Sequence, residues 1–414
     1  MAVRHIRLAS SLAALAIALV AGPAGAQTAN IPTALNDQLQ WGDVFATMNV
    51  VSRHGGRQGA TSTATAVGNT VSGANLAGGL DARSRQTMSG ATGAIAVLGA
   101  DDACCLAVAA ASAQANAAQA QTVGGDIRLD LGQTADGGDV SSLAHVNLRN
   151  TSALSASASS AVNNAVASAG HGTMNAMLRQ DSAVSSSAVT DVDACCTAGT
   201  VAGATASANT FGISAYTATT HADYTQNSTG ATSSAAVDVY QYQGYGVTAA
   251  SVAAANSATI ASQHGYASLR GRQNSETAVR AETRVTLASW RDTAVSSAYA
   301  VGNATLATNV GSDLLVDVGQ FNSGGVAADA SFTGGTAGLE SGLAVVSATA
   351  IGNAFTGYVC SYCGDANVSG SVSQVNGGAV TSTGTISTTG AGGVIGSATA
   401  IGNSATFITT TSRP

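Results

Sequence analysis

The 414-residue chain contains no lysine, three prolines and few aromatic residues, and only 9% of its residues are charged. The missing lysine excludes lysine-dependent phosphate-binding loops and Schiff-base enzymes. Glutamate occurs only at Glu276, Glu282 and Glu340, which gives weak support to a hydrolase with paired carboxylates. Scarce proline and charge also argue against disorder, because disordered tracts usually favour both. The abundant alanine is interleaved with Gly, Ser, Thr, Val and Asn, which disfavours helices.

Long apolar runs are also scarce, and the one near the N-terminus predicts export. It follows Arg4 and Arg7 and ends at Ala24-Gly25-Ala26, the pattern of a secretory signal peptide over 1–26. An N-terminal membrane anchor is the alternative, but the run is too short to span a bilayer. Without those two arginines, 13 basic residues remain against 22 acidic ones. This balance disfavours nucleic acids and anionic membranes as partners.

What the chain does contain is a long internal repeat. The phrase SATAIGN occurs at 347–353 and again at 397–403, and weaker copies recur upstream. Asparagine recurs at intervals of 45 to 50 residues, and glutamine recurs at a second position of each repeat with nearly the same period. The recurring residues are Asn69, Asn116, Asn164, Asn209, Asn256, Asn303, Asn353 and Asn403, with Gln86, Gln133, Gln180, Gln226, Gln273, Gln320 and Gln374. Because two independent positions keep the same register, random drift of a low-complexity sequence is a poor explanation for the repeat.

This pattern predicts an all-β fold, a repetitive β-solenoid of about eight repeats of roughly 47 residues. Stacked coils place equivalent residues about 4.8 Å apart, so their amides can donate and accept along the axis as a ladder. Alternation in SATAIGNSATFITT is typical of strands. We expect a cap or lead-in segment at 27–48, the solenoid at 49–407 and a tail at 408–414. Each repeat is either one wide coil or two rungs.

A finer period of two repeats is superposed on the single one. Arginine precedes Gln86, Gln180 and Gln273 but is absent before the glutamines between them. His-Gly recurs at His171 and His264. Either adjacent repeats present different faces, or the pattern records a past duplication.

Few segments resemble catalytic motifs. Arg53-His54-Gly55 and Arg57 are similar to the phosphate-binding signature of histidine phosphatases, but Gln58 or Gly59 stands where proline is expected. We therefore interpret this segment as a polar first coil or cap. The histidines elsewhere lack metal spacing, and the Asp residues near the two Ala-Cys-Cys phrases lack the repeated Gly-Asp pattern of calcium-binding β-rolls. No metal, cofactor or catalytic residue is expected.

Six cysteines in an exported chain predict disulfides, either within each pair or between facing coils. The pairs are Cys104 and Cys105, Cys195 and Cys196, and Cys360 and Cys363. A zinc site and a redox role are weaker alternatives. Tyr240, Tyr242 and Tyr245 predict either an ordinary cross-strand aromatic ladder, which we favour, or a strip that contacts sugar or a partner.

The repeat phrases resemble known families of surface proteins. They are similar to curlin repeats, although those are about half as long, and to the head repeats of trimeric autotransporter adhesins. The best overall resemblance is to the holdfast-anchor protein family of stalked alphaproteobacteria, specifically its large secreted D component. This resemblance implies a cell-surface, outer-membrane-associated protein that helps anchor an adhesive polysaccharide, the holdfast.

The same resemblance implies export through a curli-like outer-membrane pore, other secreted anchor proteins as partners, and no catalytic residues. Self-association is a further expectation. The rival hypotheses are a polysaccharide-acting β-helix enzyme and a generic adhesin or fibre-forming protein.

Overall fold

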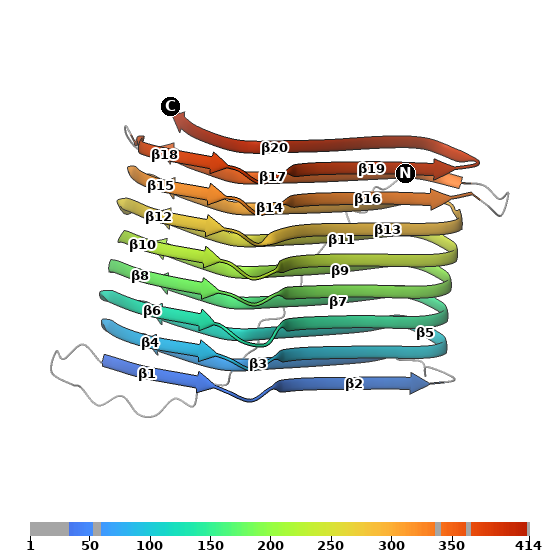
Figure 1. Ribbon diagram of the computed structural model, residues 1–414, viewed down its shortest axis with the longest axis horizontal. Coiled ribbons are helices and arrows are strands. Elements are labelled where there is room, and N and C mark those ends of the chain that lie inside the picture. Colours follow the sequence, from blue (N-terminus) through green and yellow to red (C-terminus); the bar gives the residue numbers. More distant parts are fainter. Residues whose placement is uncertain (1–32, 53–58, 336–340, 362–365, 412–414) are drawn as a thin grey trace. The chain divides into compact units, whose positions relative to one another are not determined.

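The backbone winds through parallel strands stacked in register, as a computed structural model shows for residues 33–52, 59–335, 341–361 and 366–411 (Figure 1). Within these ranges the chain forms 20 strands and no helix. None of these residues therefore belongs to an apolar helix that could cross a membrane. The expected all-β solenoid is confirmed, because each strand pairs in parallel with its equivalent in the next coil.

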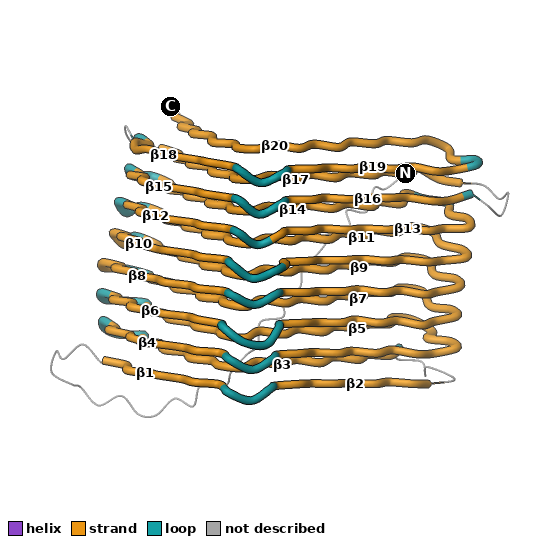
Figure 2. Tube along the Cα trace, in the orientation of Figure 1, coloured by secondary structure: helices purple, strands orange, loops and turns teal. Residues whose placement is uncertain are grey.

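Each coil follows the same path around a flattened cross-section. The chain runs along a short strand of the first sheet, passes a tight corner, and continues along a second strand in the same layer (Figure 2). It then reverses and returns along one long strand behind both. In the sixth coil these parts are β12 (Ala267–Ser275), β13 (Ala278–Trp290) and β14 (Thr293–Val310). In the central coils the last two parts form one continuous strand, such as β11 (Thr232–Gln263).

Two sheets arise from this path. The first has eight strands in the order β1-β4-β6-β8-β10-β12-β15-β18, and the second holds the remaining strands. The other bounds are β1 (Thr33–Gln40), β2 (Val44–Ser52), β3 (Ala60–Asn75), β4 (Leu80–Met88), β5 (Thr92–Thr122), β6 (Ile127–Ala135), β7 (Val140–Ala169), β8 (Gly172–Ser182), β9 (Ser186–Tyr216), β10 (Ala218–Ser228), β15 (Leu314–Asn322), β16 (Val326–Gly334), β17 (Ser341–Ser361), β18 (Val368–Asn376), β19 (Val380–Thr388) and β20 (Ala391–Thr411).

The register answers the question that the period left open. Gln133 of β6 pairs directly with Gln180 of β8, one repeat later in the sequence. Each repeat is therefore one wide coil rather than two rungs. Pairing starts at β1 and β2, inside the segment expected to be a lead-in, and β20 extends to Thr411. Eight strands of the first sheet at about 4.8 Å each give a stack of about 38 Å.

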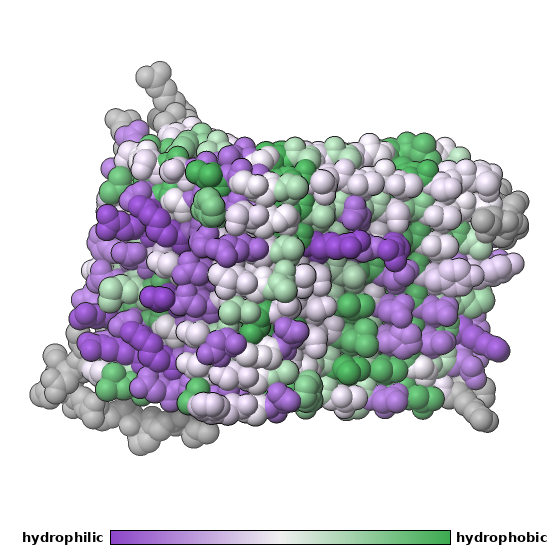
Figure 3. Space-filling model, viewed as in Figure 1, coloured by the Kyte–Doolittle hydropathy of each residue, from purple (hydrophilic) through white to green (hydrophobic). Residues whose placement is uncertain are grey.

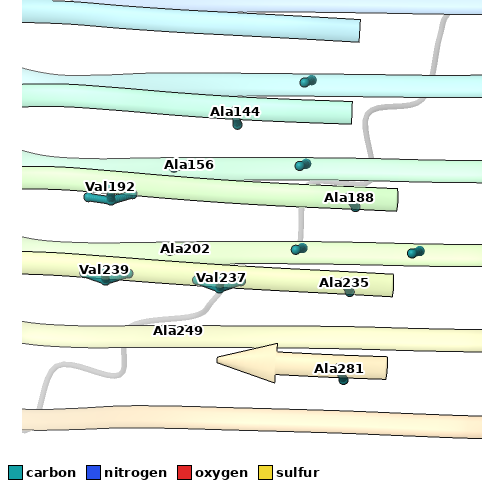
Figure 4. Packing of buried hydrophobic residues seen from close by; sticks show 14 of the residues in the cluster. Ala144, Ala156, Ala188, Val192, Ala202, Ala235, Val237, Val239, Ala249 and Ala281 are labelled. Carbon is teal, nitrogen blue, oxygen red and sulfur yellow. The ribbon is translucent and has the colours of Figure 1, made fainter. Parts of the chain in front are cut away.

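The core between the layers is built mainly from alanine and valine. Ala188, Ala235 and Ala281 form one vertical row on the inner face, and Val192 and Val239 form another (Figure 4). Side chains of this size let the outgoing and returning strands approach closely and still fill the space between them. The abundant alanine thus belongs to a thin sheet core, not to helices.

Large buried side chains extend over glycine in a neighbouring coil. The Tyr224 ring is fully buried, and a Cβ added at Gly271 would lie 2.3 Å from its Cζ. Trp290 is also fully buried, and a Cβ added at Gly334 would lie 2.6 Å from its Cζ3. Each of these two rings therefore lies over a glycine in the next coil, because coils are closer together than a ring is wide.

The outer surface obeys the same rule, which gives the two-repeat period a physical cause. A Cβ at Gly132 would lie 2.7 Å from Cδ of Arg85, and a Cβ at Gly319 would lie 3.1 Å from Cδ of Arg272. At one corner, His264 has a φ of 59°, and a Cβ at Gly311 would lie 3.0 Å from its Nδ1. Long side chains alternate with small ones, so adjacent coils do present different faces.

The two tryptophans offer a direct test of this packing. Trp290 is 0% exposed and its ring centroid lies 4.8 Å from that of Phe332, whereas Trp41 is 74% exposed. In Trp41→Phe, the remaining indole should emit at short wavelength and be quenched by acrylamide several-fold less than the single indole of Trp290→Phe, since water is excluded around it. Equal quenching in the two variants would contradict the packing of the sixth coil.

Candidate functional site

Two ladders of side-chain amides run through the whole stack. In one, Nδ2 of each asparagine donates to Oδ1 of the asparagine in the next coil, at 2.8 to 2.9 Å. In the other, Nε2 of each glutamine donates to Oε1 of the glutamine in the preceding coil, at 2.7 to 2.9 Å. The two ladders therefore have opposite donor directions.

The structure changes two members of the expected set. In the third coil the ladder residue is Asn163, which is 0% exposed, and not the neighbouring Asn164. Asn164 lies on the opposite face of the strand because side chains alternate, and its backbone carbonyl accepts from Gln133. Gln38 adds a first member to the glutamine ladder. It lies 48 residues before Gln86, so the period alone could have found it.

Both ladders also join the two layers. The second N–H of Asn116 donates to the carbonyl of Thr134 at 2.9 Å, from the returning strand to the first sheet. The second N–H of Gln133 donates in the other direction, to the carbonyl of Asn164 at 3.0 Å. Both N–H groups of each amide are thus used beside the corner where the first sheet ends. The ladders stabilise the scaffold and leave no amide free for chemistry within the central coils.

The outer face of the first sheet carries a groove of about 640 Å³. It crosses strands β6, β8, β10, β12 and β15, and each contributes outward side chains. Figure 3 shows hydrophilic side chains gathered over this sheet, on the left of the view. The charged and the exposed apolar side chains of its lining are Arg128, Met177, Asp223, Arg270, Leu315 and Asp317. Met177 and Leu315 are apolar yet 46% and 44% exposed.

Charges in and beside the groove are held by pairing between coils. Arg272 Nη2 lies 3.3 Å from Oδ2 of Asp317, and Arg270 Nε lies 3.5 Å from the same oxygen. The hydrogen bonds from Arg272, with a smaller contribution from Arg270, lower the pKa of Asp317 below its ordinary value. Asp317 therefore remains a carboxylate, available to accept hydrogen bonds, into acidic conditions.

The tyrosines lie elsewhere, in the middle of β11, where the fifth coil turns back into its returning part. Tyr240, Tyr242 and Tyr245 are each about half exposed. The cross-strand neighbours of Tyr240 are Asp193 and Thr286, so the aromatic ladder that we favoured does not exist at this position. Tyr245 instead has the Arg291 guanidinium 5.8 Å from its ring centroid. A contact with sugar or a partner stays a prediction for these residues.

The cysteines correct a second expectation. Cys195 and Cys196 are free thiols with sulfur atoms 2.6 Å apart, and Cys360 is also free. Cys105 is disulfide-bonded, and Cys363 lies outside the described residues. The two Ala-Cys-Cys phrases cannot face each other, because β7 lies between their strands. Burial, with a hydrogen bond to Cys195, raises the pKa of Cys196 to about 11, so it is a poor nucleophile at neutral pH. The side chain of Cys104 is not described.

The remaining chemical motifs form no centre in the described part of the chain. His54 and the arginines around it lie outside the described residues. His145 pairs with Asp191 at 2.9 Å, and His221 contacts Ser268 at 2.6 Å, each across neighbouring coils. Within residues 33–52, 59–335, 341–361 and 366–411, no three His, Cys, Asp or Glu side chains gather as metal ligands would.

A family model described as holdfast attachment protein D matches residues 54–325, well over half of the chain. The chain belongs to this family. The matched range includes the groove and most of both ladders. Neither curated proteins nor solved structures gave a match. Membership of the family implies a role in holdfast attachment, and the family's description names attachment rather than catalysis.

Sequence reasoning missed the groove for a definite reason. Its residues come from five strands whose equivalent positions are 46 or 47 residues apart, and no short motif connects them. A comparison of equivalent positions in successive repeats could have found the groove. Aligning the repeats on glutamine would have placed Arg128, Asn175, His221, Ser268 and Leu315 in one row.

The neighbouring asparagines of the third coil test the ladder. Asn163→Ala leaves an N–H of Asn116, Oδ1 of Asn209 and the carbonyl of Asp181 without their partner in a buried site. We expect a loss of about 2–5 kcal/mol in the free energy of unfolding. The matched control Asn164→Ala should cost less than about 0.5 kcal/mol. Equal losses, measured by denaturant unfolding, would contradict the assignment.

Titration of Asp317 tests the charge pairing. Because folding lowers this pKa from 3.8, the paired carboxylate stabilises the fold above that value. The stabilisation is lost as the pH falls through the lower folded pKa. Carboxyl ¹³C NMR, assigned with Asp317→Asn, should give a midpoint below 3.8 that rises in Arg272→Gln. Arg280→Gln, on β13, is the control and should leave the midpoint unchanged. An unshifted midpoint in Arg272→Gln would refute the pairing.

Proposed function

We propose that the chain is a non-enzymatic attachment protein, exported to the cell surface, that helps anchor an adhesive polysaccharide to the outer cell envelope. Its family supports the attachment role. The polysaccharide site that we propose is the groove across five strands of the first sheet, because it runs along the stack as an extended polymer would need. Its side chains stand on strands in a fixed register, which suits a repeating ligand.

The groove has the chemistry that a polysaccharide requires. Arg128, Arg270, Asp223 and Asp317 offer planar donors and acceptors for hydroxyl groups. Met177 and Leu315 offer apolar contact for the C–H surfaces of sugar rings. The lining thus combines polar groups that can fix a ligand's orientation with apolar side chains that can contact it, as ligand sites commonly do.

The same electrostatics argue against hydrolysis at this groove. A glycosidase needs a carboxylic acid with a raised pKa to protonate the leaving oxygen. Asp317 has a lowered pKa because Arg272 and Arg270 hold its carboxylate. It is therefore suited to binding and not to proton donation. We propose that the other partners implied by the family, secreted anchor proteins and a curli-like export pore, contact surfaces outside this groove.

Binding to purified adhesive polysaccharide tests the proposal. We expect the wild-type chain to cosediment with polysaccharide from cells that lack this protein. Arg270→Gln and Met177→Ala should each weaken binding about tenfold, the effect of losing one charge-assisted hydrogen bond or one apolar contact. In cells, deletion of the gene should release adhesive into the medium.

Arg280→Gln is the control, because it removes the same charge from β13, outside the groove. Binding by Arg270→Gln and Met177→Ala at wild-type strength would reject the groove as the site. New reducing ends in the incubated polysaccharide would instead favour a polysaccharide-acting enzyme.

A further inference from the structure

Among the described residues, both ends of the stack are open sheet edges. At one end β1 pairs only with β4, and β2 and β3 pair only with β5. At the other end β18, β19 and β20 pair only with β15, β16 and β17. The terminal coils are divided in the same way, into a short strand, a second short strand and a long returning strand. Each edge is therefore a template of matching shape for the other.

No described residue covers the core at either end of the stack. Val44, Ala46 and Val50 pack on the core from the first coil and stay partly exposed. Val380, Ile386 and Ala391 do so from the last coil. Equivalent inward positions in the central coils are fully buried, as at Ala188 and Ala235. A further coil at either end would bury this apolar surface.

The usual protection of sheet edges is missing from the last coil. Between Val368 and Thr411 there is no charged residue and no proline, although natural edges are commonly blocked by both. The first coil holds Asp37 and Asp43 among its described residues, so no like charge opposes them across a joint. Among the described residues of these two coils, no like charges oppose each other.

The ladder ends are complementary. At the last coil, Asn403 accepts from Asn353, and among the described residues its own Nδ2 has no acceptor. Gln374 donates from Nε2, and its Oε1 accepts no described hydrogen bond. At the first coil, Oδ1 of Asn69 accepts no hydrogen bond from a described residue, and Gln38 uses one N–H for Thr70 while its other N–H has no described acceptor. Each unused donor thus has an unused acceptor at the opposite end.

We propose that the last coil of one copy binds the first coil of a second copy, so that sheets, core and both ladders continue across the joint. Nδ2 of Asn403 then donates to Oδ1 of Asn69 in the next copy. Nε2 of Gln38 in that copy donates to Oε1 of Gln374. The contact leaves the groove on the flank untouched, and it does not depend on what the groove binds.

Parallel pairing and the donor directions together favour one polarity for the assembly. Joining two last coils would pair their strands antiparallel, and with like layers facing it would also place two Asn403 donors opposite each other and two Gln374 acceptors opposite each other. Head-to-tail joining satisfies all four groups and keeps the strands parallel. Because a head-to-tail contact along a straight axis does not close, it produces an open filament with one copy per about 38 Å.

Two conservative variants each block one end. Asn403→Asp keeps the acceptor for Asn353 and replaces only the outward donor, at a residue exposed in the single copy. Gln38→Glu keeps the acceptor for Gln86, loses its outward donor and also loses the hydrogen bond to the carbonyl of Thr70. Each then turns a carboxylate toward an oxygen of the next copy. We expect the wild-type chain to form filaments that lengthen with concentration, and each variant alone to stay monomeric by analytical ultracentrifugation and electron microscopy.

The mixture of the two variants gives the decisive result. Asn403→Asp keeps an intact first coil, and Gln38→Glu keeps an intact last coil. An equimolar mixture should therefore form dimers of one copy each and nothing longer. Gln119→Glu is the control, since it adds the same charge on an exposed flank of β5 and should form filaments as the wild type does.

Circular dichroism and the protected emission of Trp290 establish that each variant is folded. Filaments from either single variant, or a mixture that stays monomeric or grows past dimers, would overturn the proposal. A wild-type chain that remains monomeric at all concentrations would do so too.

Discussion

The structure depends on one constraint: every residue lies about 4.8 Å from its equivalents in the coils above and below. A residue that recurs in every coil must therefore be compatible with an identical side chain close enough to form a hydrogen bond with it. Asparagine and glutamine satisfy this condition fully, because each amide both donates and accepts along the column. Their opposite donor directions, one ladder upward and one downward, also oppose the dipoles of the two columns. Each ladder ties the returning strand to the first sheet, so the same amides set the register and join the layers.

The constraint also explains the composition. A charge repeated in every coil would repel its own copies, as Asp238 shows: burial raises its pKa, and the neighbouring Asp191 adds to the effect. Charged residues are accordingly few. They pair along one strand, as Arg179 does with Asp181, or across coils, and Arg85 alternates with Gly132. Inside the core, Tyr224 and Trp290 follow the same rule with Gly271 and Gly334. Small residues are the default because the spacing between coils is fixed and leaves little room for anything else.

Much of this could be predicted from the sequence, because the period shows in residues that must repeat. The solenoid and most ladder positions follow from that period alone. It could not decide between Asn163 and Asn164, since a choice between adjacent residues depends on which one faces inward. It could not give the path of the coil either, because one wide coil and two narrow rungs share the same period. The groove was hidden because its residues need not repeat: Arg128 and Leu315 belong to one column without resembling each other.

The groove on the outer face of the first sheet and the edges of the terminal coils are separate surfaces, so a contact at one does not block the other. The groove faces away from the axis, whereas the open edges face along it. Adding copies along the axis therefore multiplies groove sites on one side without blocking any of them. A polysaccharide that binds several grooves at once binds far more tightly than one groove allows, since later contacts form within the same complex. A weak site on a rigid repeated scaffold is thus sufficient for strong attachment, and the rigidity that the amide ladders impose keeps those sites aligned.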